Sequence, residues 1–260
     1  MIRLSVNVNK VATLRNSRGG AVPSVSEAVA VCLNAGVRGI TVHPRADERH
    51  ITRRDVAALA DQLGTATRPP VLHGIHPGAD AGGVEFNIEG DPRADFVDLV
   101  VAARPHQCTL VPVAPGEVTS QAGWPASTSP ERLTAVIARL HAEGIRVSLF
   151  VDPEEAPIRW ARRLGADRVE LYTEPFAKAF ASGRDAGRAS FDTYAAAASL
   201  AHALGLGVNA GHDLDLENLV VFRELPCLDE VSIGHALVSH ALFVGLDRAV
   251  RDYLAAVGGR

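Results

Sequence analysis

Cysteine is scarce in this chain, and its spacing fits neither a disulfide framework nor a zinc site. Cys32, Cys108 and Cys227 are odd in number, lie far apart and form no C-x-x-C pair. A disulfide framework and a zinc knot are therefore not expected, and a reducing compartment is the simpler inference.

Targeting and membrane segments are missing too. The first residues lack the basic region, apolar run and small-residue cleavage site of a signal peptide. No stretch approaches the about 20 consecutive apolar residues that a membrane-spanning helix needs. A formal net charge of −4, with both signs mixed along the chain, gives no reason to expect nucleic acid or a membrane surface as the main partner. These absences predict a soluble cytoplasmic protein.

Short strands that alternate with helices fill the chain. Its 260 residues, 47% of them apolar, can bury one large α/β core or two small ones. A β-branched run followed by a helical pattern recurs at a spacing of roughly 30 residues, without a linker or a shift in composition. The eight predicted strands are residues 4–8, 39–42, 84–88, 107–111, 146–151, 168–171, 207–210 and 230–233. They predict a single (β/α)8 (TIM) barrel over residues 1–260, with extra short helices.

An open, doubly wound sheet is the alternative fold. It usually has a Gly-rich first turn, whereas residues 7–10 read Asn-Val-Asn-Lys. The segments 14–20 and 172–189 are predicted as loops. Residues 64–83 are predicted as an inserted loop, in which His73 and His76 are spaced like two metal ligands but are interpreted as loop residues.

The densest set of ionisable side chains follows the second strand. The chain runs there from a β-rich segment into His43, Arg45 and His50, and Thr52 with Asp55 has the form of a helix N-cap. These groups therefore lie on a strand-to-helix loop at the carboxyl end of a strand, where ligands bind in α/β proteins. For one such loop, a solvated basic turn is the alternative.

Similar side chains follow other strands. In a barrel all carboxyl ends meet at one mouth, where the active site lies. The amino ends carry no comparable set in the sequence, so an active site is predicted on one rim. Glu89, a lone carboxylate at the end of an apolar strand, is a candidate for a raised pKa. The mouth candidates are Asn7, Asn9, His43, Arg45, Glu89, Thr119, Asp152, Glu170, His212 and His235.

Two places suggest phosphate binding. At Gly234 and His235 the last strand turns directly into a helix, and the loops after strands seven and eight usually hold phosphate in this fold. Arg18 and Arg45 offer bidentate donors to a second anion. The sequence thus implies two phosphorylated substrates or one bisphosphate. A metal-dependent hydrolase is not favoured, because the first strand ends in Asn-Val-Asn rather than His-x-His.

Five motifs resemble those of pyridoxine 5′-phosphate synthases, and the likeness runs from Leu4 to about Tyr253. They are residues 6–19 (VNVNKVATLRNSRG), 39–52 (GITVHPRADERHIT), 86–90 (FNIEG), 208–212 (VNAGH) and 233–236 (IGHA). The resemblance implies a barrel, usually assembled as an octamer of four dimers. It also implies the condensation of 1-deoxy-D-xylulose 5-phosphate with 3-amino-2-oxopropyl phosphate, giving pyridoxine 5′-phosphate, phosphate and water in vitamin B6 biosynthesis, without a metal or organic cofactor.

The resemblance also implies roles for single residues. His43 and Glu89 would accept protons, His212 would donate one, and Glu170 would stabilise charged intermediates. The aminoketone phosphate would be held by Asn7, Arg18, Asp213, Gly234 and His235. The sugar phosphate would be held by Asn9, Lys10, Arg45, His50 and Thr119. Closure of the loops at residues 15–20 and after Glu170 would shield a reactive imine from water.

The chain departs from the family pattern in three places. Asn9-Lys10 stands where many members have Asp-His, Asp213 stands where many have Gly, and residues 64–83 lengthen the approach to Glu89. Two other functions stay open at this stage. A different phosphosugar lyase or isomerase would share the phosphate sites, and a non-catalytic phosphate-binding relative would lose an acid–base group.

Overall fold

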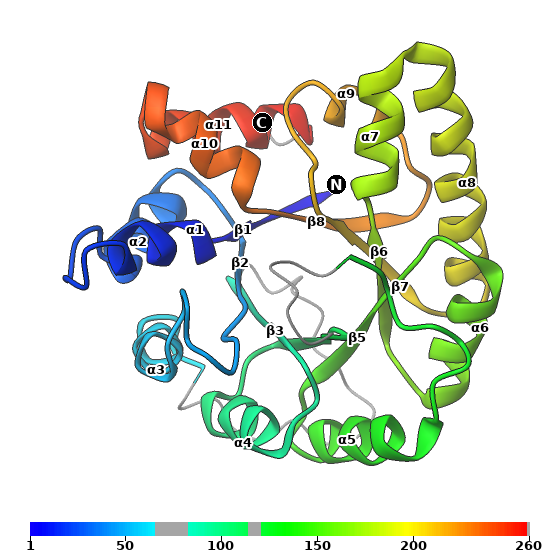
Figure 1. Ribbon diagram of the computed structural model, residues 1–260, viewed down its shortest axis with the longest axis horizontal. Helices are drawn as coiled ribbons and strands as arrows, with labels where there is room; N and C mark the ends of the chain where they lie inside the picture. The colour runs from blue at the N-terminus through cyan, green and yellow to red at the C-terminus, as the bar shows by residue number, and fades with distance from the viewer. Residues whose placement is uncertain (66–82, 114–120, 259–260) are drawn as a thin grey trace.

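A closed barrel of eight parallel strands forms the centre of the computed structural model, which describes residues 1–65, 83–113 and 121–258 (Figure 1). The strands pair in chain order, and β8 pairs with β1 to close the ring. They are β1 (Arg3–Asn7), β2 (Gly39–Val42), β3 (Glu85–Gly90), β4 (Gln107–Leu110), β5 (Arg146–Val151), β6 (Arg168–Tyr172), β7 (Gly207–Gly211) and β8 (Leu228–Ile233). The predicted (β/α)8 barrel is confirmed. Most of the predicted insertion, residues 66–82, lies outside the described residues.

Helices surround the barrel (Figure 1). No helix among the described residues is long and apolar enough to cross a membrane. The helices are α1 (Asn9–Asn16), α2 (Val25–Asn34), α3 (Arg53–Gln62), α4 (Ala94–Ala103), α5 (Pro130–Ala142), α6 (Glu155–Leu164), α7 (Glu174–Ser182), α8 (Arg184–Ala203), α9 (Leu219–Phe222), α10 (His235–Val244) and α11 (Leu246–Ala256).

Helix α3 begins where the sequence predicts. The Thr52 hydroxyl accepts a hydrogen bond from the Asp55 backbone N–H, and the Asp55 carboxylate accepts one from the Thr52 N–H at 2.8 Å. Such a cap typically contributes about 1 kcal/mol. One face of the helix then buries Val56 and Leu59 against the barrel core. The cap therefore fixes where the loop after β2 ends, and with it the position of the basic residues on that loop.

The inside of the barrel is polar, unlike the branched aliphatic interior usual for this fold. The Ser5 and Thr41 hydroxyls lie 2.7 Å apart, and the Thr109 hydroxyl donates to the Asn87 side-chain carbonyl at 3.1 Å. Apolar residues at the alternate strand positions belong to the hydrophobic core instead. The barrel therefore places a layer of neutral hydrogen-bonding groups beneath its mouth.

Charged residues fill the amino end of the barrel, which we call the floor. Glu85 accepts hydrogen bonds from the guanidinium groups of Arg3 and Arg146, both at 2.5 Å. The prediction that the amino ends carry no comparable set is therefore wrong. These residues begin strands far apart in sequence, and only the barrel register brings them together. The floor consists of Arg3, Glu85, Gln107, Arg146, Arg168 and Glu230.

The predicted loop 14–20 is helical at its start. Helix α1 continues to Asn16, because the Arg15 guanidinium is anchored on the Asp55 carboxylate, with one contact at 2.8 Å, and on the His50 carbonyl at 3.1 Å. The turn that carries Arg18 begins only after this anchored segment.

The predicted loop 172–189 is also wrong. Helix α7 and the start of α8 occupy it, separated at Gly183, whose φ of 144° breaks the helix. Pro175 lies in the first turn of α7, where proline favours a helix. Phe176 then packs on Tyr194 and Phe222, with ring centroids 6.0 and 4.9 Å away. By contrast, the predicted break at Gly245 between the last two helices is confirmed.

Candidate active site

A cavity of about 570 Å³ opens at the carboxyl ends of the strands. The predicted site residues within the described chain line it, with two exceptions. Arg18 is exposed on the turn after α1, and Asp152 lies outside the lining, where its carboxylate accepts a hydrogen bond from the Gly123 N–H at 3.2 Å. Thr119 lies outside the described residues. The lining residues are Asn7, Asn9, Lys10, Thr13, His43, Arg45, Arg49, His50, Glu89, Glu170, Tyr172, Glu174, His212, Asp213, Leu214, Ser232, Ile233, Gly234, His235 and Ala236.

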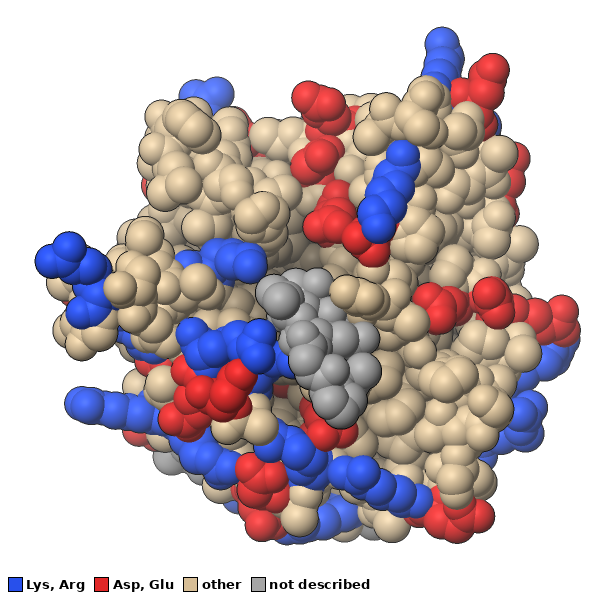
Figure 2. Space-filling model, in the orientation of Figure 1, with Lys and Arg blue, Asp and Glu red and all other residues tan. Residues whose placement is uncertain are grey.

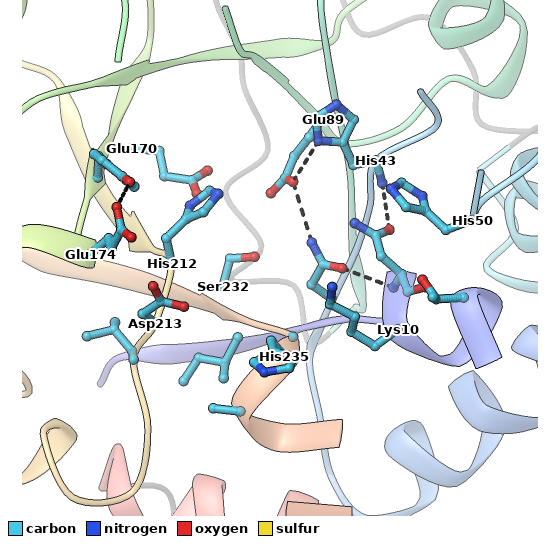
Figure 3. Close-up of a pocket in the computed structure, with 18 of the residues that line it drawn as sticks. Lys10, His43, His50, Glu89, Glu170, Glu174, His212, Asp213, Ser232 and His235 are labelled. Carbon is cyan, nitrogen blue, oxygen red and sulfur yellow. Dashed lines mark hydrogen bonds and ion pairs between the residues drawn. The ribbon is translucent and has the colours of Figure 1, made fainter. Parts of the chain in front are cut away.

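One hydrogen-bonded chain connects the ends of the first three strands (Figure 3). The Asn9 side-chain carbonyl accepts from the His43 backbone N–H at 2.9 Å, and the Asn9 N–H donates to the Asn7 side chain at 3.0 Å. The Asn7 amide then reaches the Glu89 carboxyl group at 3.5 Å. The Nδ1 atom of His43 lies 3.8 Å from the same carboxyl oxygen. The two asparagines thereby orient a histidine–carboxyl pair.

Both members of that pair are neutral in the free protein. Burial, together with the nearby His50 and Arg45, lowers the pKa of His43 to about 3. Burial and the neighbouring Glu170 and Glu230 raise the pKa of Glu89 well above its usual value, the direction that the sequence predicts. The contact is therefore between an unprotonated imidazole and a carboxylic acid, not an ion pair. His43 can accept a proton, and Glu89 holds one.

Glu170 lies deeper in the barrel, on β6. Its Oε2 atom is buried without a hydrogen-bond partner among the described residues. Burial and the charge of Glu230 raise the pKa of Glu170. A Cβ atom at Gly211 would lie 2.7 Å from its other carboxyl oxygen, so only glycine at that position leaves room for this carboxyl group.

His212 follows β7 in a backbone conformation that favours glycine. Its φ is 85° and that of Asp213 is 58°, and such angles at non-glycine residues often mark functional sites. Aspartate tolerates this region better than most residues, which explains how Asp213 can occupy it. Burial lowers the pKa of His212, while Asp213 and Glu174 oppose that shift.

The two sides of the mouth carry opposite charges. Figure 2 shows Lys and Arg side chains beside α1 and the loop after β2, and Asp and Glu side chains near α7. The cavity-lining members on the basic side are Lys10, Arg45 and Arg49, next to His50. Burial, followed by the charges of Arg45 and Lys10, lowers the pKa of His50 to about 4, so this histidine is neutral. The basic side offers donors to an anion.

A second place for an anion lies at the start of α10. Gly234 is the N-cap and His235 the first helical residue, so free backbone N–H groups meet the cavity there. A Cβ at Gly234 would lie 3.0 Å from the Asn7 carbonyl oxygen, which is tighter than most such contacts. Glycine thus lets the helix start approach β1 closely.

Among the cavity residues to which the sequence reasoning gave no role are Tyr172, Glu174 and Ser232. Tyr172 lies two positions after Glu170 on the same strand, so the strand period of two was a usable signal. Glu174 fell in the segment predicted as a loop. Among the described residues, no group of three or more His, Cys, Asp or Glu side chains is arranged to hold a metal ion.

A family model described as "Pyridoxal phosphate biosynthesis protein PdxJ" matches residues 4–259. A protein of Porphyromonas gingivalis named pyridoxine 5′-phosphate synthase is 48% identical over 254 residues, covering 97% of this chain and 98% of its own. A protein of the same name from Leptospira biflexa is 49% identical over 256 residues, covering 98% of this chain and 96% of its own.

Solved structures of lower identity share the fold. The tryptophan synthase alpha chain of Legionella pneumophila matches with a TM-score of 0.62 at 12% identity, covering 98% of this chain and 91% of its own. The phosphoribosyl anthranilate isomerase of Thermus thermophilus matches with a TM-score of 0.54 at 14% identity, covering 98% of both chains. At these identities the likeness concerns the barrel alone.

Proposed function

This chain belongs to the PdxJ family of pyridoxal phosphate biosynthesis proteins, and from that premise we propose how its mouth works as a pyridoxine 5′-phosphate synthase. The reaction joins 1-deoxy-D-xylulose 5-phosphate to 3-amino-2-oxopropyl phosphate and releases pyridoxine 5′-phosphate, phosphate and water. The observation that carries the proposal is the convergence of His43, Glu89, Glu170 and His212 on one cavity with two places for an anion.

The two phosphate groups bind at opposite parts of the mouth. The aminoketone phosphate lies at the start of α10, on the N–H groups near Gly234 and His235, with Asn7 and the backbone of Asp213 beside it. Using the backbone N–H of Asp213 avoids repulsion between its carboxylate and the phosphate. Arg18 reaches this phosphate from the turn after α1.

The sugar phosphate lies on the basic side. Lys10 and Arg45 supply its positive charge, and Asn9, His50 and Thr119 complete the site. Neutral His50 accepts a hydrogen bond from the Ile51 N–H through Nδ1 at 2.9 Å, so a proton on its other nitrogen can face the phosphate. This arrangement leaves the two reacting carbon chains between the acid–base groups.

The chain's own groups move the protons. Imine formation, dehydration, phosphate loss and ring closure each need proton transfer, which a positioned side chain accelerates by about 10²–10⁴-fold. His43, neutral at working pH, accepts first. Once protonated, His43 lies 3.8 Å from Glu89 and favours the ionised form of that carboxyl group. Glu89 can then give its proton to the hydroxyl group that leaves as water, and becomes the next acceptor. His212 donates from the opposite wall, and Glu170 stabilises positive charge on the intermediates once it is ionised.

We extend the proposal to assembly and location. Leu242 and Phe243, at the end of α10, are 70% and 89% exposed, and such side chains favour contact with a second copy. A homo-octamer of four dimers, as in the family resemblance, would cover them. The unpaired cysteines are consistent with the cytoplasm. Light scattering coupled to size exclusion tests the assembly, since a monomeric mass would contradict it.

Incubation with both substrates tests the function. The absorbance of the pyridine ring and free phosphate should rise together, and omission of either substrate should abolish both signals. Phosphate release from the sugar phosphate alone would instead indicate a different phosphosugar reaction. Binding of both phosphates without any product would indicate a non-catalytic relative.

A further inference from the structure

The imidazole of His212 is held in an unusual way. Its Nδ1 atom is buried and makes no hydrogen bond of normal distance and angle in the part of the chain that the structure describes, although the neighbouring Gly211 backbone helps to raise the pKa of the ring. A catalytic histidine is normally oriented by a hydrogen bond on the nitrogen that does not react. Something else must fix this ring if it is to give a proton in one direction.

Two aromatic rings enclose the imidazole. Phe150 on β5 lies 4.8 Å from it between ring centroids, and Tyr172 on β6 lies 5.5 Å away in an edge-on arrangement at 80°. Phe150 and Tyr172 also contact one another at 5.4 Å. These separations fall within the range in which aromatic pairs attract with a preferred geometry. The three rings therefore form one packed unit at the wall of the cavity.

The Tyr172 ring is itself fixed. Its hydroxyl donates a hydrogen bond to the Glu174 carboxylate, and Glu174 forms an ion pair with Lys178 at 2.8 Å. The next residue, Thr173, donates its hydroxyl to the carbonyls of Gly211 and His212. The same short segment thus holds both the backbone and the ring of His212.

We propose that Tyr172, anchored by Glu174, is a positioning residue that holds the His212 imidazole for proton donation in place of a hydrogen-bond partner. This inference rests on the proposed function, in which His212 is the proton donor. Sequence reasoning assigned no role to Tyr172 or Glu174. The aromatic packing restricts rotation of the ring, and Glu174 adds a negative charge on the same side of the cavity.

The charge of Glu174 has a predictable effect on the pKa of His212. The titratable groups that act on this ring are Asp213 from its own loop, Glu174 from α7 and His43 from the end of β2. Burial lowers the pKa of His212, and the two carboxylates raise it. Removing Glu174 should therefore lower that pKa further, and opening the aromatic wall to water should raise it toward the value of a free imidazole.

Kinetics of three variants test the positioning role. Tyr172→Leu removes the ring and should lower kcat by about 100-fold with a smaller change in KM, as expected for a misplaced catalytic group. Tyr172→Phe keeps the ring and should recover most of that loss. Glu174→Gln should shift the alkaline fall of kcat to lower pH, because His212 must be protonated to donate. The exposed Glu224, which forms an ion pair with Arg188, supplies a matched control, and Glu224→Gln should leave the profile unchanged.

Titration of the histidine rings by NMR separates this inference from the function. In protein labelled at the histidine Cε1 carbon, the His212 signal is assigned by its loss in His212→Gln. Glu174→Gln should move its titration to lower pH and Tyr172→Leu to higher pH, whether or not the substrates react. The proposal is overturned if folded Tyr172→Leu keeps both the wild-type kcat and the wild-type titration, or if Glu174→Gln leaves the His212 titration in place.

Discussion

Glu85 and Glu89 lie four residues apart on the same strand, and both are buried, with 2% and 5% of their surface exposed. At the floor, Glu85 contacts Arg3 and Arg146, and its pKa is lowered despite burial. At the mouth, Glu89 has no arginine or lysine within ion-pair distance among the described residues, and its pKa is raised by burial. One strand therefore presents the same side chain in two protonation states.

The difference in ionisation between Glu85 and Glu89 indicates a different role for each of these two carboxyl groups. A buried charge is destabilising unless it is paired and hydrogen-bonded, so the floor carboxylate supports the fold only together with its arginines. The mouth carboxyl avoids that penalty by keeping its proton. A buried carboxyl group whose raised pKa lets it hold a proton and later release it can serve acid–base catalysis. The floor thus holds the barrel together, and the mouth stores the protons that the reaction moves.

The largest expected effect is at the mouth. Glu89→Gln should lower kcat by about 10²–10⁴-fold, because the amide cannot exchange a proton with His43. Substrate binding and folding should change little, since the neutral amide resembles the carboxylic acid it replaces. Steady-state kinetics and substrate titration check this, with Glu224→Gln as the control for the loss of a carboxylate. Turnover near the wild-type rate would remove Glu89 from the mechanism.

At the floor the same substitution should act on stability instead. Glu85→Gln removes the counter-charge of Arg146 and leaves Arg3 with its longer contact to Glu230 at 3.4 Å, and breaking a buried ion pair in this way typically costs about 3–5 kcal/mol. Chemical unfolding should show that loss, while kcat of the folded fraction stays close to the wild-type value. A variant that unfolds normally but loses turnover would contradict the separation of the two ends.

The pH dependence of stability should have opposite signs for Glu89 and Glu85. In the unfolded chain Glu89 releases its proton above about pH 4.3, whereas in the folded protein it keeps that proton to higher pH. Its contribution to the free energy of unfolding therefore falls as pH rises toward the folded pKa. Glu89→Gln should therefore gain stability relative to the wild type as pH rises above about 4.3, by about 1.4 kcal/mol per pH unit until the folded pKa is reached.

For Glu85 the folded pKa is lowered, so its stabilising contribution is present above about pH 4.3 and is lost as pH falls through the folded value. The deficit of Glu85→Gln should thus shrink in acid. Thermal melts of both variants across this pH range check the sign of each slope of stability against pH. Parallel plots for the two variants would contradict the opposite signs.

A smaller effect is expected outside both regions, at Arg18. Its side chain is exposed on the turn after α1, and a phosphate that accepts charge-assisted hydrogen bonds from it would order that turn. Arg18→Ala should raise the KM for the aminoketone by roughly tenfold, more than the KM for the sugar phosphate. Hydrogen exchange of the turn with and without ligand provides an independent check. Equal protection in both states would exclude the turn as a lid.

The sequence predicts the mouth better than the floor. β-branched runs followed by helical patterns give the eight strands, and the carboxyl-end rule then brings His43, Glu89 and His212 together. The floor could not be found in this way, because Arg3 and Glu85 are 82 positions apart and meet only through the strand register. Helix α7 was missed because Phe176 is stabilised by rings from distant segments, which local composition does not reveal.

Infrared spectroscopy at neutral pH tests the contrast between floor and mouth most directly, because the C=O stretch of a carboxylic acid is separate from the bands of a carboxylate. The account predicts an acid band in the wild-type protein that loses intensity in Glu89→Gln. An unchanged acid band in Glu89→Gln would contradict it.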